Sequence, residues 1–512
     1  MKKIKLYIIA FFSTILLLIS CDKDFDETNT DKINLRALDP AYILNSSVIN
    51  VSERGGRSYL LNTHTTIQWL LCPYGTSQVG ANYNQWTSGQ DDPWHSFYNS
   101  AIQRIIDVIY ATKDDPSKSN LYNAARIWKA YIFQILTDTY GDIPYKEAGL
   151  GFYEQLMYPS YETQEDIYRD LLKEFDEASA ALDTKGTIAG EIFYGGNVAR
   201  WKKFGYSMLL RTAMRLSKVD PVTAQTYVTK AINGGLMASN DDNAWMKHTS
   251  EFANRMGSEI SGTEKGNYYI TEYFVNFLKS TKDPRLGPLT HRYPGAKDAV
   301  AQVDSIRTKD PAKQIGMPMG YDPVTISERF AQDSVVAIHD YSQIDWKIFF
   351  MNTSPEFYCT YGQTQLLLAE AIMRGWATGN AADAYAKAVR ANMKLYTLFS
   401  NAATISDSAI DAYIVAHPLD TTAAAAIKQI NEEYWIGSLP NGSEGWANWR
   451  RSGYPDLPVN TYSGSEIPGE FFRRHKYPQS ERISNRENLL QAIDRSLGGV
   501  DRMNARVWWD KE

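Results

Sequence analysis

The sequence has few of the patterns that carry catalysis or metal binding. Its three cysteines and seven histidines are scattered over 512 residues, and they form neither a His-Glu-x-x-His motif nor another zinc-binding spacing. It also lacks a glycine-rich loop of the Walker type and a Gly-x-Ser-x-Gly elbow, the local signatures of nucleotide binding and of α/β-hydrolases. The motifs therefore indicate no metal site, no nucleotide site and no α/β-hydrolase site, and we expect no cofactor.

The sequence also has no excess of basic residues and no second long apolar run. The chain carries 53 lysines and arginines against 59 acidic residues, and this acidic balance does not favour nucleic-acid binding. Beyond the first twenty residues, no apolar run is long enough to span a bilayer. Hydrophobic residues make up 44% of the chain and charged residues 22%, which supports a large core and excludes global disorder. The 33 tyrosines and 13 tryptophans indicate either flat contact surfaces or thick helix packing.

Residues 1–20 resemble a bacterial signal peptide. Three lysines precede an apolar run from Leu6 to Ile19, which is short for a membrane helix. The run ends in Leu-Ile-Ser-Cys at 18–21, the pattern of a lipobox. We expect cleavage before Cys21 and lipidation of this residue, because several acyl chains anchor a protein firmly to a membrane. An ordinary secretory signal followed by a chance cysteine is the alternative.

A polar tether is predicted over residues 21–40. The acidic stretch Asp22–Glu27 follows the predicted anchor at once and resembles the surface-export signal of Bacteroidetes lipoproteins. A solvated linker is a compatible interpretation. Residues 41–512 contain no recognisable interdomain linker, so we expect them to form a single domain.

Helical periodicity dominates this predicted domain. Over Asn123–Tyr140 the apolar residues fall on one broad helix face, and Gly141 and Pro144 end the pattern. A capping-box sequence at 163–166 predicts the start of the next helix. Two more segments share the apolar periodicity: Val198–Leu216 and Pro221–Asn233.

The clearest helical hairpin is Gln365–Met393. Ala369 in its first half and Ala388 in its second are small enough for two helices to approach, and Tyr385 fills the groove, as in a tetratricopeptide repeat. We expect about four helix pairs of this type and therefore a mainly α fold. Long irregular segments separate the pairs: 72–96, 236–268, 286–345 and 436–490. Structured loops on a rigid scaffold are where binding usually resides.

Ligand contacts are predicted in the first of these segments. Residues 78–94 combine tryptophan and tyrosine with amides, and sugar rings stack on aromatic faces while amides bond their hydroxyl groups. Glycines and Pro93 argue against a continuous helix there. The candidates are Asn82, Tyr83, Trp86 and Trp94 in this segment, and Tyr268, Tyr269 and Tyr321 further along the chain. Aromatic residues that only anchor the loops to the scaffold are the alternative.

Two pairs of residues, one of cysteines and one of aspartates, need separate interpretation. Cys72 and Cys359 lie among apolar and aromatic neighbours, so a disulfide, which an exported protein permits, and two buried free thiols are both compatible with the sequence. Asp91 and Asp92 are interpreted as a solvated turn, since adjacent carboxylates seldom face one substrate from both sides. A glycosidase carboxylate pair elsewhere stays open, because acidic residues are abundant.

Several stretches resemble signatures of the SusD/RagB family of outer-membrane lipoproteins. Together with the lipobox they extend over nearly the whole chain after the signal peptide. The stretches are Leu136–Ala148, Asp283–Leu286, Ala369–Trp376, Glu444–Pro455, Arg473, Tyr477-Pro478, Glu481 and Val507–Asp510. Gly445 stands where the family usually has another small residue.

This resemblance implies a SusD-like fold, with four tetratricopeptide-like helix pairs as scaffold and a loop-rich ligand face opposite them. It implies residence at the outer membrane facing outward, and a partner, a SusC-like TonB-dependent transporter, over which the lipoprotein closes as a lid. It implies no catalysis. The expected role is capture of an oligosaccharide and its delivery to that transporter. The alternatives are a non-glycan nutrient such as a peptide, an all-helical glycoside hydrolase, and a purely structural lipoprotein.

The signature stretches themselves are expected to be structural. Asp142 can accept backbone N–H groups in its turn. Arg450 and Arg451 are expected to pair with buried acids such as Glu444, and Arg285 is expected to form a structural ion pair at a helix end.

Overall fold

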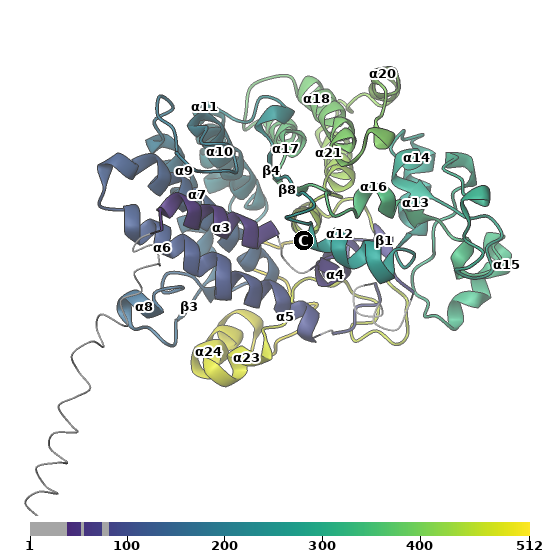
Figure 1. Cartoon of the computed structure of the whole chain (residues 1–512), viewed down its shortest axis with the longest axis horizontal. Coiled ribbons are helices and arrows are strands. Elements are labelled where there is room, and N and C mark those ends of the chain that lie inside the picture. Colours follow the sequence, from purple (N-terminus) through teal and green to yellow (C-terminus); the bar gives the residue numbers. More distant parts are fainter. Residues whose placement is uncertain (1–37, 53–55, 74–80, 86) are drawn as a thin grey trace, which may run out of the picture. The chain divides into compact units, whose positions relative to one another are not determined.

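Paired helices dominate the computed structural model, which describes residues 38–52, 56–73, 81–85 and 87–512 (Figure 1). The predicted signal peptide, Cys21 and nearly all of the predicted tether lie outside these residues. The first described helix is α3 (Pro40–Ser52), and Pro40–Glu512 pack as one unit. In the described part of the chain, no helix combines the length and the hydrophobicity needed to span a bilayer.

Consecutive long helices form the scaffold. The pairs are α7 (Ser119–Tyr140) with α9 (Gln164–Ala181), α10 (Val198–Arg215) with α11 (Pro221–Gly234), α17 (Tyr361–Met373) with α18 (Ala381–Lys394), and α21 (Ala423–Gly437) with α22 (Gly442–Ser452). The pairs also pack on one another, because α9 contacts α10 and α10 contacts α17. Ala369 and Ala388 of the predicted hairpin are fully buried, as a close helix contact requires. The predicted mainly α fold with about four helix pairs is confirmed.

Local signals set the ends of these helices. α9 begins where the sequence predicts, because the Thr163 hydroxyl accepts a hydrogen bond from the Asp166 amide at 3.1 Å. α17 begins at Tyr361, ahead of the predicted start at Gln365, because Thr360 and Gln363 form a capping box.

One segment that was predicted to be irregular is helical. Residues Thr87–Ser96 form α5 although Gly89 and Pro93 stand inside it. A proline removes the helical hydrogen bond to the carbonyl four residues earlier, which here belongs to Gly89. The Nδ2 of Asn62 donates to this carbonyl at 2.8 Å. A side chain from another part of the fold thus satisfies the carbonyl that the proline leaves without a partner.

A small antiparallel sheet joins the irregular segments. Its strand order is β1-β5-β7-β6, and the strands are β1 (Leu70–Leu71), β5 (Tyr269–Ile270), β7 (Gln343–Ile344) and β6 (Thr290–His291). Met317 is tied to this sheet, since its amide donates to the Ile270 carbonyl at 2.9 Å and its carbonyl accepts from the Glu272 amide at 2.8 Å. Leu71, Ala81, Tyr269 and Met317 share a second, small apolar cluster. This cluster holds the loop at 81 beside the loop after 317.

Further helices and strand pairs complete the described chain. The remaining helices are α4 (Gly56–Tyr59), α6 (Ile102–Thr112), α8 (Gly151–Glu154), α12 (Arg255–Glu259), α13 (Glu272–Ser280), α14 (Leu286–Leu289), α15 (Phe330–Asp333), α16 (Trp346–Phe349), α19 (Tyr396–Phe399), α20 (Asp407–Ala416), α23 (Gln479–Ser484) and α24 (Arg486–Leu497). Two further strand pairs are β2 (Ile143–Pro144) with β3 (Tyr161–Glu162), and β4 (Ala244–Met246) with β8 (Glu356–Cys359). A π-helical turn at Phe97–Ala101 joins α5 to α6.

The two described cysteines are buried thiols. Cys72 and Cys359 form no disulfide with each other, and burial raises the pKa of the Cys359 thiol. The sequence left open a disulfide or two buried thiols, and the structure shows buried thiols.

Candidate functional site

Three loops that are far apart in the sequence meet at one surface. The Nδ2 of Asn82 donates to the Tyr321 carbonyl at 3.1 Å, and the Nδ2 of Asn460 donates to the Oδ1 of Asn82 at 3.2 Å. The Tyr462 hydroxyl donates to the Oδ2 of Asp322 at 3.3 Å. We call the region formed by Asn82, Asn84, Gln85, Tyr321, Asn460 and Tyr462 the loop face; the buried Asn82 and Asn460 lie beneath its surface and join the loops.

Charged residues fasten the other end of the first loop. The Oε1 of Glu466 accepts from the Gln85 amide at 2.7 Å, and the Glu466 amide donates to the Oδ1 of Asn84 at 2.9 Å. The Nζ of Lys476 donates to the Oε1 of Gln85 at 2.9 Å. Among the described residues, the Nδ2 of Asn84 and the Nε2 of Gln85 have no acceptor. Two amide donors are therefore available at this half-buried surface.

Glycine allows two of the loops to approach closely. Gly320 has a φ of +87°, and a Cβ at this position would lie 2.8 Å from the Oγ1 of Thr461. Only glycine adopts this conformation and tolerates this contact without strain. The ring of Tyr462 packs on Gly464, where a Cβ would lie 2.7 Å from the ring. The ring is thus held in place while it stays half-buried.

The loop face combines the groups that a polyhydroxylated ligand needs. Tyr321 and Tyr462 are both half-buried, and the Arg329 guanidinium lies 5.8 Å from the centre of the Tyr321 ring. Such rings supply apolar faces, and the neighbouring amides supply donors and acceptors. Because these side chains are already positioned by contacts within the protein, little ordering entropy is lost on binding.

Of the seven predicted contact residues, Tyr321 is half-buried at the loop face, and Trp86 lies outside the described residues. Asn82 belongs to the loop face, but its exposed fraction is 3% and both ends of its amide bond other loops, so it holds the loops together and is not open to a ligand. The other four are packed inside the protein: Tyr83, Trp94, Tyr268 and Tyr269, with exposed fractions of 1%, 3%, 1% and 0%. Rings buried to this extent present no open face to a ligand. Their burial corrects the prediction and agrees with the alternative that they anchor loops to the scaffold.

Neighbouring rings explain this burial. Tyr83 stacks on Phe472 with ring centres 6.4 Å apart, its hydroxyl donates to the Thr66 carbonyl at 3.3 Å, and burial raises its pKa to about 12. Trp94 meets Tyr98 and Tyr140 with ring centres 4.7 Å and 5.1 Å apart.

Sequence reasoning missed two residues of the loop face, Asn460 and Tyr462. Both lie in the irregular segment 436–490, whose Asn-Thr-Tyr-Ser-Gly stretch at 460–464 has the same mixture of amide, aromatic residue and glycine as the first loop. That composition was the available signal.

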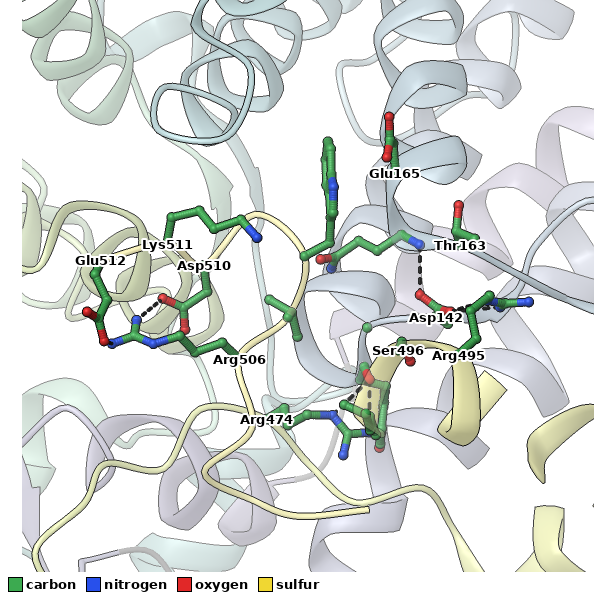
Figure 2. Close-up of a pocket in the computed structure, with 16 residues that line it drawn as sticks. Asp142, Thr163, Glu165, Arg474, Arg495, Ser496, Arg506, Asp510, Lys511 and Glu512 are labelled. Carbon is green, nitrogen blue, oxygen red and sulfur yellow. Dashed lines mark hydrogen bonds and ion pairs between the residues drawn. The ribbon is translucent and has the colours of Figure 1, made fainter. Parts of the chain in front are cut away.

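A cavity of about 590 Å³ lies between the start of α9, the end of α24 and the C-terminal stretch (Figure 2). Two ion pairs lie within its lining: Arg495 with Asp142 at 2.7 Å, and Arg506 with Asp510 at 2.7 Å. Asp142 also accepts a hydrogen bond from the Gln164 amide at 2.9 Å. It therefore caps backbone as predicted, although it does so at the start of α9 and not within its own turn.

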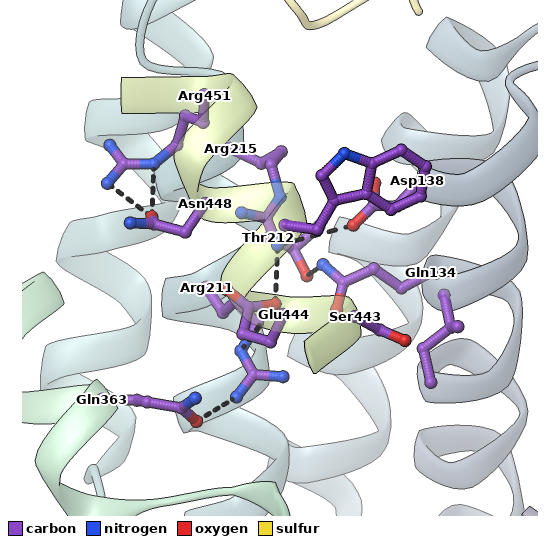
Figure 3. A network of polar contacts seen from close by, with 12 residues as sticks. Gln134, Asp138, Arg211, Thr212, Arg215, Gln363, Ser443, Glu444, Asn448 and Arg451 are labelled. Atoms are coloured by element: carbon purple, nitrogen blue, oxygen red, sulfur yellow. Dashed lines mark hydrogen bonds and ion pairs between the residues drawn. The ribbon is translucent and has the colours of Figure 1, made fainter. Parts of the chain in front are cut away.

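The signature residues of the last helix pair lie in a buried polar network (Figure 3). Glu444 pairs with Arg215 at 2.7 Å and accepts a hydrogen bond from the Tyr434 hydroxyl at 2.8 Å. Burial opposes its ionisation, but the charges of Arg211 and Arg215 hold the pKa of Glu444 below its ordinary value. The network joins α10 to α22, so it stabilises the scaffold.

The predicted pairing with a buried acid is confirmed for one of the two neighbouring arginines. Arg451 pairs with the buried Glu370 at 2.7 Å, although Glu444 was named as an example of such an acid. The guanidinium of Arg450 lies 3.9 Å from the centre of the Trp446 ring, and no described acid lies close enough to form an ion pair with it. Burial lowers the pKa of Arg450 to about 10.

The predicted ion pair of Arg285 is confirmed. Its guanidinium contacts Asp283 at 2.6 Å and Glu433 at 2.7 Å, and all three side chains are buried. The Asp-Pro-Arg stretch at 283–285 therefore has a structural role.

Comparisons with known proteins agree with this architecture. The family model SusD-like_2, described as "Starch-binding associating with outer membrane", matches residues 32–478. A solved chitin-binding protein is 31% identical with a TM-score of 0.82, and a Bacteroidetes AC2a SusD-like structure is 28% identical with a TM-score of 0.79. Both comparisons cover 93% of this chain and 100% of the other.

A chitin-binding SusD homologue from Flavobacterium johnsoniae has the same fold, with 23% identity, a TM-score of 0.73, and coverage of 92% of this chain and 99% of its own. The search of curated proteins gave no significant match. Because the family model covers most of the chain, and because a solved relative is 31% identical over nearly all of it, the protein belongs to the SusD-like family.

Proposed function

We propose that the protein captures an oligosaccharide at the cell surface and delivers it to a SusC-like TonB-dependent transporter of the outer membrane. The observation that carries this proposal is the similarity, along 93% of the chain, to a protein described as chitin-binding. The family description, which joins starch binding to association with the outer membrane, supports it. The lipobox at 18–21 supports a lipid anchor on Cys21.

The loop face supplies the chemistry for capture. Tyr321 and Tyr462 provide rings for stacking, and Asn84 and Gln85 provide free donors. Trp86 follows directly in the sequence and remains a proposed contact. Oligosaccharides of N-acetylglucosamine are the first ligands to test, because the relative's name points to them.

The test is calorimetry with hexa-N-acetylchitohexaose, together with gel retardation against a panel of soluble polysaccharides. We expect the wild type to bind, and Tyr462→Ala and Trp86→Ala each to weaken binding about tenfold or more, the loss typical of a central aromatic contact. Tyr42→Ala is the matched control, because Tyr42 is 55% exposed on α3. Binding of a peptide but of no glycan would contradict the proposal that the ligand is an oligosaccharide. Release of reducing ends would favour the hydrolase alternative.

Anchoring and delivery are tested separately. Cys21→Ala should abolish labelling by radioactive palmitate and release the protein from the membrane fraction. Co-purification of the wild type with a TonB-dependent transporter would support the partner. Its absence under conditions that preserve outer-membrane complexes would count against it.

A further inference from the structure

A second cavity lies beside α5, and no residue of the loop face lines it. Its volume is about 450 Å³, within the range of roughly 300–1,000 Å³ that is typical of ligand sites. We call it the α5–α23 cleft. Its lining includes Tyr98, Asn99, Gln103, Met157 and Asn485. None of these five residues belongs to the loop face.

The walls of the α5–α23 cleft are held by contacts within the protein. The Tyr98 hydroxyl donates to the Pro144 carbonyl at 2.6 Å, and the Nδ2 of Asn485 donates to the Pro159 carbonyl at 2.8 Å. Rigid walls favour binding, because less conformational freedom is lost when a ligand enters.

Two amides in the cleft are free to bind a ligand. Asn99 and Gln103 are four positions apart on one helical run and both are exposed, so they lie on the same helix face. Neither side chain has a hydrogen-bond partner among the described residues. In the cavity shown in Figure 2, by contrast, Asp142 and Asp510 are each paired with an arginine.

The rest of the lining is apolar or uncharged for the most part. Met157 is 75% exposed beside the cleft, and Tyr98 is half-buried within it. Glu481 is the one carboxylate that lines the cleft in the described part of the chain, and it accepts a hydrogen bond from the Tyr161 hydroxyl at 2.7 Å. An anionic ligand would meet this carboxylate and no lysine or arginine in the described lining, and it would lose hydration, whereas an uncharged ligand with many hydroxyl groups matches the amides and the apolar wall.

From these features we infer that the α5–α23 cleft is a second carbohydrate-binding site, which takes an uncharged segment of the same glycan chain that the loop face binds. This inference rests on the proposed function. Two chain segments run between the sites. Gln85 of the loop face lies shortly before α5, which contains Trp94 of the cleft lining, and Lys476, which bonds Gln85, lies shortly before Ser480 of the lining. The ten residues of α5 advance by about 15 Å, so a glycan must cover the loop face, this distance and the cleft to contact both sites, which a long polymer can do.

The test compares four proteins: the wild type, a loop-face variant (Tyr462→Ala with Trp86→Ala), a cleft variant (Asn99→Ala with Gln103→Ala), and a combined variant. Alanine at exposed helical positions preserves the helix. The probes are hexa-N-acetylchitohexaose in calorimetry and soluble glycol chitin in gel retardation. Gln225→Ala with Asn233→Ala is the matched control, since it removes two exposed amides from α11.

We expect the cleft variant to bind the hexamer at the loop face almost as the wild type does. Its affinity for the polymer should fall about tenfold, because the wild type can hold one glycan chain at two sites and this raises the overall affinity. The loop-face variant should still bind glycan weakly. Adding the cleft substitutions should lower this remaining affinity about 30-fold, as expected for two lost hydrogen bonds. The control pair should change neither measurement.

The inference is overturned if the loop-face variant shows no binding at all while the wild type binds, or if the cleft variant matches the wild type on the polymer. It is also overturned if the cleft substitutions change only co-purification with a transporter, since the cleft would then be a protein contact. No binding by the wild type to either probe or to any polysaccharide of the panel would remove the proposed function itself. Failure of this inference and failure of the proposed function therefore give different results.

Discussion

Replacing Glu370 by glutamine is expected to lower the free energy of unfolding by about 3 kcal/mol at pH 7. The carboxylate of Glu370 is fully buried and accepts from both terminal nitrogens of Arg451 at 2.7 Å, and Arg374 contacts it at 2.8 Å. Burial opposes ionisation, but these two guanidinium groups hold the pKa of Glu370 at about 2, against an ordinary value of 4.5. The difference between these pKa values corresponds to about 3 kcal/mol. Breaking a buried ion pair typically costs about 3–5 kcal/mol, which agrees.

The destabilisation should depend on pH in one direction. Because the pKa of Glu370 is lower in the folded than in the unfolded protein, its contribution is fully present above pH 4.5 and is lost as the pH falls toward 2. The difference in stability between the wild type and Glu370→Gln should therefore shrink to less than half of its neutral value by about pH 3.

Unfolding in urea, followed by circular dichroism at pH 7 and pH 3, measures this difference. Glu165→Gln is the matched control, because the Glu165–Arg169 pair lies on the exposed side of α9 and such pairs contribute less than about 1 kcal/mol. Equal losses for the two variants at pH 7 would refute the reasoning. A loss for Glu370→Gln that does not change with pH would refute it as well.

Three further outcomes are expected. Trp94→Ala should lower stability by about 3–5 kcal/mol, seen as an earlier unfolding transition, because the ring is buried; an unchanged transition would contradict its placement. Gly320→Val should weaken glycan binding while the helical circular dichroism stays the same, because a Cβ would force the loop away from Thr461; unchanged affinity would show that this contact does not shape the site. Cys72 and Cys359 should resist a thiol reagent in the folded protein and react after unfolding, and rapid reaction of the folded protein would contradict their burial.

Helices whose signals are local were predictable from sequence. α9 starts at the predicted Thr163 cap, and α10 and α11 match their predicted ranges to within a residue. Periodic apolar residues and caps act within a few positions of one another, so a single sequence contains the whole of that information.

The exposure of aromatic residues was not predictable in the same way. Tyr83 and Tyr321 were both proposed as ligand contacts, but Tyr83 is covered by Phe472 while Tyr321 stays half-buried. A composition that suits a binding loop also suits a loop packed on its scaffold. Which of the two occurs depends on residues hundreds of positions away.

By itself, the sequence determined the helical scaffold, the family signatures and the presence of an aromatic, amide-rich loop before α5. Tertiary structure alone decided that α5 continues through Pro93, because Asn62 supplies the missing partner for the Gly89 carbonyl. It also decided that Asn460 and Tyr462 complete the loop face, through contacts with Asn82 and Asp322. The physical reason is that hydrogen-bond partners and solvent exposure are set by long-range packing, whereas helix periodicity and capping are set by neighbours along the chain.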